Sequence, residues 1–149
     1  MRFLPLAAAS LAAVATLSTG LPAYAAAPAV QIIKVYYDSP GPDRRSSSSL
    51  NAEYVVLKNA TRSTIQLEKW ILRDKTGYKY RFGAFALRAG KSVTVRTGSG
   101  SDGTSTVYWG RGQYVWNNDG DTASIHRASD LKKVDACSWG RSGDWTNCS

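Results

Sequence analysis

The sequence predicts an all-β domain, built as a sandwich or barrel of about seven to nine short strands. From residue 30 onward, short runs of β-branched and aromatic residues alternate with polar residues. Turn residues separate these runs at intervals of roughly 8–12 residues, as in known sandwiches and barrels. No stretch shows the sustained periodicity of an amphipathic helix.

The first 25 residues have the layout of a secretory signal peptide. Arg2 is the only charge before Lys34, an alanine- and leucine-rich run follows it, and residues 23–25 read Ala-Tyr-Ala. The apolar run is short and interrupted, which disfavours an uncleaved membrane anchor. We therefore expect cleavage after Ala25, a secreted, extracellular protein, and no membrane span in the mature chain.

Residues 26–149 have the length of one domain that can bury a core of its own. The net charge of +8 becomes +7 when the leader, whose only charge is Arg2, is removed. A positive balance favours anionic partners such as nucleic acid, wall polymers or lipid headgroups, and it also keeps a protein soluble.

Local residue patterns predict the individual strands, loops and turns. Residues 53–59 carry apolar side chains on both faces, which predicts a central strand. Residues 39–49 predict a polar loop, 74–77 a hairpin turn that uses Gly77, and 97–104 a mobile loop rich in glycine and serine. The runs with strand character are 30–37, 53–59, 65–68, 70–74, 78–82, 92–96, 107–109, 114–116, 122–127 and 132–137.

Several motifs occur in order along residues 31–139. They are Asn51-x-Glu53-Tyr54-Val55-x-Leu57-x-Asn59, Leu67-x-x-Trp70-x-Leu72-x-Asp74, Gly90-x-x-Val93-x-Val95, Trp109-Gly110, Val115-Trp116-Asn117-Asn118-x-Gly120-Asp121-x-Ala123 and Val134-Asp135-x-Cys137-Ser138-Trp139. Together they resemble the lamin tail domain family, and the later motifs are similar to those of bacterial secreted members. The resemblance implies an immunoglobulin-like β-sandwich and a non-catalytic binding or scaffolding module.

Cys137 and Cys148 are the only cysteines, and an even number in an exported chain predicts a disulfide. The bond would close a short C-terminal loop over residues 137–148. A metal site is disfavoured, because two cysteines and the single His126 cannot supply four close ligands unaided.

The sequence contains no recognisable catalytic constellation, so we expect a protein that is not an enzyme and needs no cofactor. His126 could serve as a general base, but a base needs a nucleophile and an orienting group. We interpret it as a solvent-facing or interstrand residue. No serine lies in a nucleophile-elbow motif, and the spacing of Glu53 and Glu68 gives no reason to pair them.

Two oxygen-rich groups are candidate calcium sites. Residues 117–121 place Asn and Asp side chains around Gly120, which also fits a tight turn, the interpretation that we favour. A weaker candidate would need residues around the serine-rich loop to converge, namely Asp38, Asp43, Asn51 and Glu53.

A basic stripe is the first of two candidate binding surfaces. Alternation places Arg73, Lys79 and Arg81 on one face of a hairpin, with Lys75 at its tip. Such a stripe could track a phosphate chain, which makes an extracellular nucleic-acid-binding accessory protein the alternative function. It could also be a solvated face that keeps an exposed strand from pairing with other chains.

An aromatic cluster is the second candidate, and it would fit an extracellular protein or a cell-wall or carbohydrate polymer. Most of the tryptophans could instead belong to the core, as we expect for Trp70. The candidate residues are Trp109, Arg111, Tyr114, Trp139 and Trp145. The sequence thus predicts a secreted binding or scaffolding module without naming its ligand.

Overall fold

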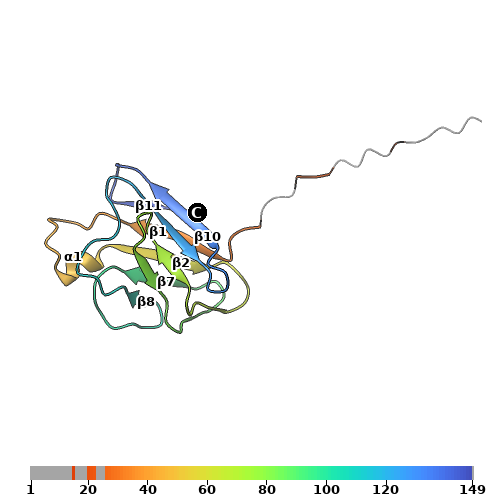
Figure 1. The fold of residues 1–149 in the computed structure, drawn as a ribbon, viewed down its shortest axis with the longest axis horizontal. Helices are drawn as coiled ribbons and strands as arrows, with labels where there is room; N and C mark the ends of the chain where they lie inside the picture. The colour runs from red at the N-terminus through yellow and green to blue at the C-terminus, as the bar shows by residue number, and fades with distance from the viewer. Residues whose placement is uncertain (1–14, 16–19, 23–25, 149) are drawn as a thin grey trace, which may run out of the picture.

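The computed structural model describes residues 15, 20–22 and 26–148. The predicted signal peptide, residues 1–25, lies almost wholly outside these residues. The described chain forms two packed sheets, a small two-stranded sheet and one short helix (Figure 1). A search of its helices finds none with the length and apolar character needed to cross a membrane.

The larger sheet has five strands, and the predicted central strand is its middle member. Neighbouring strands of this sheet run antiparallel, except for the last pair in the order below, which runs parallel. In spatial order the strands are β11 (Trp145–Asn147), β1 (Val30–Tyr36), β2 (Tyr54–Asn59), β7 (Ser92–Arg96) and β8 (Thr106–Tyr108).

The second sheet has four antiparallel strands. In spatial order they are β10 (Lys133–Trp139), β9 (Asp121–His126), β4 (Ile71–Arg73) and β5 (Lys79–Arg81). A separate pair joins β3 (Ile65–Gln66) to β6 (Ala86–Leu87). The described residues thus hold eleven strands, more than the seven to nine expected, and β6 and β11 lie outside every run with strand character.

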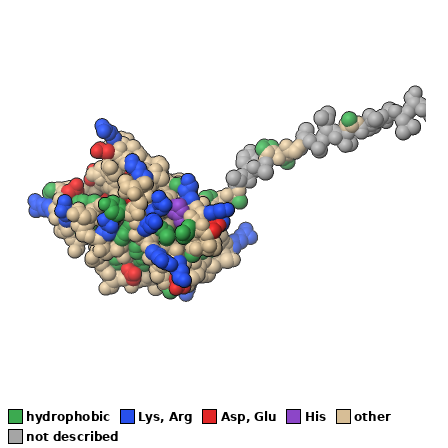
Figure 2. Space-filling model, in the orientation of Figure 1, with side chains coloured by type: hydrophobic (Ala, Val, Ile, Leu, Met, Phe, Trp, Pro, Cys, Tyr) green, Lys and Arg blue, Asp and Glu red, His purple; other side chains and the backbone are tan. Residues whose placement is uncertain are grey.

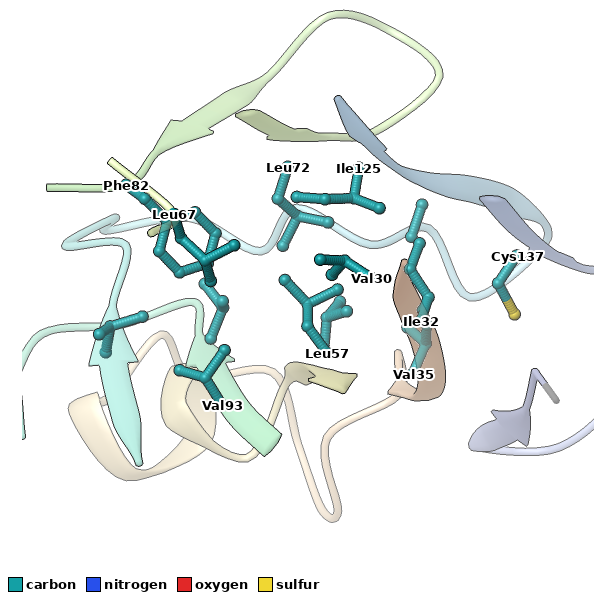
Figure 3. Close-up of a cluster of buried hydrophobic side chains, with 14 of the residues drawn as sticks. Val30, Ile32, Val35, Leu57, Leu67, Leu72, Phe82, Val93, Ile125 and Cys137 are labelled. Atoms are coloured by element: carbon teal, nitrogen blue, oxygen red, sulfur yellow. The ribbon is translucent and has the colours of Figure 1, made fainter. Parts of the chain in front are cut away.

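The core lies between the two sheets and is built by alternation along each strand. Leu72 of β4 and Ile125 of β9 are fully buried and lie opposite Val30 and Leu57 of the larger sheet (Figure 3). Removal of such side chains from water is the main force that holds the two layers together. Cys137 lies at one border of this cluster.

The Cys137–Cys148 disulfide is present, as predicted, with 5.6 Å between the two Cα atoms. Cys137 belongs to β10 and Cys148 directly follows β11, so the bond joins the two sheets. Along the same border the backbone N–H of Ile32 donates to Asp135 Oδ2 at 2.8 Å. One side of the sandwich is therefore closed by a covalent link and a hydrogen bond.

Two local predictions are wrong. The predicted serine loop contains a helix, α1 (Ser47–Asn51), which is capped by Ser46 and held by the buried Leu50; Figure 1 shows it at one end of the sandwich. Residues 114–116 form no strand. Val115 is buried there, but its N–H donates to the carboxylate of Glu53 and not to a neighbouring strand.

Candidate binding surfaces

Three of the predicted basic residues lie together on the outer face of the four-stranded sheet. Arg73 and Lys79 are directly opposite each other in register, and Arg81 is opposite Ile71. Leu72, the strand neighbour of Arg73, is fully buried and pairs with Tyr80, the strand neighbour of Lys79 and Arg81, so these three cations point away from the core. Lys75 does not join them, because its Nζ donates to Gly120 O at 3.1 Å near the hairpin tip.

The ring of Tyr80 lies on the inner side of the same hairpin and packs on Phe82 and Trp109. Burial, followed by the charge of Asp102, raises the pKa of Tyr80 to about 12. The phenol therefore stays neutral across the physiological range. The hairpin is apolar toward the core and cationic toward solvent.

Strands β9 and β10 extend this outer face. Ser124 pairs with Arg73, His126 pairs with Ile71, and Lys133 of β10 pairs with His126. We define the basic sheet face as Arg73, Lys79, Arg81, His126 and Lys133. Figure 2 shows blue Lys and Arg side chains around the purple side chain of the single histidine.

None of the residues of β4, β5, β9 and β10 that point outward in this register is acidic. The carboxylate of Asp135 is turned away to Ile32 N, and Asp121 is buried. Asp130, in the loop after β9, forms an ion pair with Arg127 at 2.7 Å, which lowers the pKa of its carboxyl group. The cations of the basic sheet face are therefore not neutralised from within their own sheet.

Both ring nitrogens of His126 have hydrogen-bond partners. Nδ1 lies 3.0 Å from the carbonyl oxygen of Leu131, which can only accept, so Nδ1 carries the proton. The Ser124 hydroxyl lies 2.9 Å from Nε2, which accepts its proton whenever the ring is neutral. Sequence reasoning missed this contact, although two residues separated by one position on a strand share a face.

Ser124, His126 and the carbonyl of Leu131 are arranged like a nucleophile, a base and an orienting group. Their surroundings nevertheless suit a structural role. Ser124 is only 8% exposed, so an acyl carbon has little room to approach its hydroxyl. The contact fixes the orientation of the imidazole on the basic sheet face. The interpretation of His126 as a surface residue between strands fits this geometry.

The five residues of the predicted aromatic surface do not come together. Trp109 and Trp139 are half-buried in a continuous series of rings that also includes Trp116, with 5.9 Å between successive ring centroids. Trp139 ends the series by stacking on the buried Tyr37 at 4.9 Å. These tryptophans fill the space between loops and core, so they are not free for a ligand.

The remaining three members are dispersed. The guanidinium of Arg111 lies over the ring of Tyr78 at 4.2 Å. The hydroxyl of Tyr114 contacts Ser49 Oγ at 2.5 Å, next to α1. Trp145 lies on β11, in the other sheet, and is 47% exposed. The prediction that these five residues form a single ligand surface is therefore wrong.

The five-stranded sheet carries a row that sequence reasoning did not predict. Trp145, Tyr36, Tyr54 and Arg96 follow one another in register across β11, β1, β2 and β7. Lys34 lies one outward position away, with its Nζ 4.4 Å from the centroid of the Trp145 ring. The only signal in the sequence is the spacing Lys34-x-Tyr36, because the row joins residues far apart in the chain.

The first calcium candidate, residues 117–121, forms a turn. Asn117 Oδ1 accepts from Asp119 N at 2.8 Å, and the two carboxylate oxygens of Asp121 accept from backbone N–H groups, among them Thr122 N at 2.7 Å. These oxygens satisfy the backbone, as the turn interpretation expects.

The second calcium candidate does not converge. Glu53 is inside the domain, and Asn51 donates to Ser99 O from the end of α1. Burial, then the charge of Asp144, which is not in the predicted set, and then that of Asp43 raise the pKa of Asp38. Within the described ranges no three His, Cys, Asp or Glu side chains are placed to hold a metal ion.

The fold defines an immunoglobulin-like β-sandwich module with two candidate surfaces on its outer faces. The chain belongs to the lamin tail domain family, because the model of that family, described as Lamin Tail Domain, matches residues 23–141. This range contains the whole of residues 31–139, over which the motifs show the resemblance. No curated protein sequence matches the chain closely enough to count as a relative.

Proposed function

We propose that this protein is a secreted, non-catalytic binding module that binds phosphate-bearing polymers outside the cell through its basic sheet face. The layout of residues 1–25 supports export. The Cys137–Cys148 bond is compatible with an oxidising compartment. The ligands of this class include extracellular nucleic acid and the phosphodiester polymers of a bacterial envelope.

One observation carries the proposal: cations on adjacent strands share an outer face that presents no carboxylate of its own strands. Neighbouring strands lie about 4.8 Å apart, so Arg73 and Lys79 can contact closely spaced phosphates. Lys79 and Arg81 are exposed, and Arg73 is half-buried with its position fixed by the sheet. A set of like charges that no carboxylate of its own strands opposes favours anions.

The test measures binding of the purified protein to a short DNA duplex and to poly(glycerol phosphate) over a range of salt concentrations. If the three cations each neutralise one phosphate, the log–log slope for the duplex is about −2.7. The triple variant R73S/K79S/R81S should lose most of the affinity and of the slope. Absence of binding to both polymers at low salt would overturn the proposal.

A matched control separates a specific face from net charge. The triple variant K58S/R62S/K91S removes the same charge from exposed positions outside the basic sheet face. It should keep the wild-type slope and lose only a little affinity through the weaker long-range field. Equal losses in the two triple variants would show that the face has no special role.

A further inference from the structure

The row on the five-stranded sheet points to a second, chemically different site, and we propose that it binds an acidic glycan, a polysaccharide whose sugars carry carboxylates. Trp145, Tyr36, Tyr54 and Arg96 occupy one line across four strands. We call these four residues and Lys34 the cation–π row. The proposal goes beyond the function above, because this face belongs to the other sheet.

The row points away from the core. Val35, Val55 and Val95 are the strand neighbours of Tyr36, Tyr54 and Arg96, and each is at most 2% exposed. Successive side chains on a strand alternate between faces, so the aromatic and basic members lie on the outer face. Three strand spacings of about 4.8 Å give the row a length of roughly 14 Å, enough for several sugar units of a linear chain.

The row is held in place by its own contacts. Tyr36 and Tyr54 stack with 5.5 Å between ring centroids. The guanidinium of Arg96 lies 5.2 Å from the Tyr54 ring and donates to Asn51 O at 2.6 Å. These cation–π and hydrogen-bond contacts order the side chains before a ligand arrives, which lowers the entropic cost of binding.

Trp145 supplies the most exposed ring of the row. It is 47% exposed, and β11 is an edge strand with β1 as its only neighbour in the sheet. Lys34 Nζ lies over the Trp145 ring, 4.4 Å from its centroid, so the C–H-rich face of a sugar would pack on the indole surface that Lys34 leaves open, with the ammonium placed to bind a carboxylate on that sugar. Stacking and charge therefore act on the same sugar unit.

The charges on the strands of this face favour an anionic partner, whereas Asp38 and Asp144, whose charges act on each other, lie in the loops that follow β1 and precede β11. The charged residues that point outward from β1, β2, β7, β8 and β11 are Lys34, Lys58 and Arg96, and none in this set is acidic. At the far end of the row, the ring of Tyr108 is covered by the loop at Gly100. The open part of the face thus runs from Trp145 to Arg96.

The arrangement of ring faces favours a glycan over single-stranded nucleic acid. Stacking of successive bases needs several free aromatic faces in sequence. Here Tyr36 and Tyr54 cover each other, and Arg96 covers Tyr54, so Trp145 alone is more than a third exposed. A polysaccharide can lie along the row with one stacked sugar and polar contacts to the tyrosine hydroxyls.

The experiment titrates the purified protein with oligogalacturonate, a neutral oligoglucan of similar length and oligo(dT), and follows tryptophan fluorescence and calorimetric heat. Oligogalacturonate should bind, and W145A should weaken this binding roughly tenfold or more, as for a central aromatic contact. K34Q should weaken binding of the acidic glycan severalfold. The neutral glucan should bind more weakly than the acidic one.

Tyr78→Ala is the matched control, because Tyr78 is also 47% exposed and also contacts a cation, Arg111, but lies elsewhere. It should bind oligogalacturonate like the wild type, and so should R73S/K79S/R81S at physiological salt. Unfolding midpoints of W145A and Y78A verify that both variants fold. Equal binding by W145A and wild type, equal losses in W145A and Y78A, or preference for oligo(dT) would each overturn the proposal.

Discussion

The carboxylate of Glu53 accepts a hydrogen bond from the backbone N–H of Val115, 2.8 Å away and 62 residues later in the chain. The same oxygen accepts from the Thr97 hydroxyl at 2.7 Å. Glu53 is 1% exposed, and its other carboxyl oxygen has no hydrogen-bond partner among the described residues. One buried acid therefore ties the start of β2 to two segments that form no regular strand.

Because Glu53 is a buried acid, we expect the stability of the protein to depend on pH. Burial raises the pKa of Glu53 from 4.5 to about 7, although its hydrogen bonds act in the opposite direction. A raised folded-state pKa means that its stabilising contribution is complete below pH 4.5 and is lost as pH rises through about 7. The free energy of unfolding should fall by up to roughly 3 kcal/mol across this window.

Glu53→Gln is neutral at every pH and keeps an acceptor oxygen for Val115. Urea unfolding at pH 4.5, 6 and 8 should show that this variant loses less stability with rising pH than the wild type. Glu68→Gln, the same change at the exposed second glutamate, should keep the wild-type pH profile. Parallel profiles for the wild type and E53Q would contradict the assignment.

The disulfide should make a large contribution to stability. Cys137 and Cys148 are separated by 11 positions, and β11 is attached to the sheet only through β1. Replacement of both cysteines by alanine should lower the free energy of unfolding by roughly 2–4 kcal/mol. Amide hydrogen exchange of residues 145–147 should become faster as well. Wild-type protein treated with a reductant is the control and should match the variant, while unchanged stability in both would refute this role.

Alternation on β4 predicts that substitutions at adjacent positions lower the stability by different amounts. Leu72 is fully buried, and Ile71 is half-buried on the outer face of the same strand. Leu72→Ala should cost about 2–5 kcal/mol, because it opens a cavity in the core. Ile71→Ala should cost clearly less. Denaturant unfolding of both variants measures the difference, and equal losses would mean that the two layers are packed differently from this structure.

The architecture was predictable where the signal is local. The inward and outward sides of β4 and β5 follow from period-two alternation, and the disulfide follows from having only two cysteines. The strands β6 and β11 were missed, because neither lies in a longer alternating run, whereas β4 and β5 lie in the runs 70–74 and 78–82. The helix α1 was missed because its stability depends on a buried side chain, Leu50, and not on propensity.

The two candidate surfaces differ in the same respect, because a local pattern predicts only the first of them. Arg73, Lys79 and Arg81 lie within one hairpin, so alternation alone places them together. The cation–π row joins β1, β2, β7 and β11, and its register depends on a topology that no local pattern specifies. The predicted aromatic cluster failed for the same reason, since the burial of Trp109 and Trp139 is decided by loops packed across the sandwich.

The close approach of Gly100 to Tyr108 gives the last prediction. A Cβ atom at Gly100 would lie 2.5 Å from two atoms of the Tyr108 ring, whereas one at Gly112 would meet nothing within 4 Å. Gly100→Ala should therefore lower the free energy of unfolding by about 1–3 kcal/mol, and Gly112→Ala should leave it nearly unchanged. Tyr108→Ala removes the clashing ring, so Gly100→Ala should cost much less in that background. A double-mutant cycle by denaturant unfolding measures this coupling, and additive losses would show that the ring and the loop do not touch.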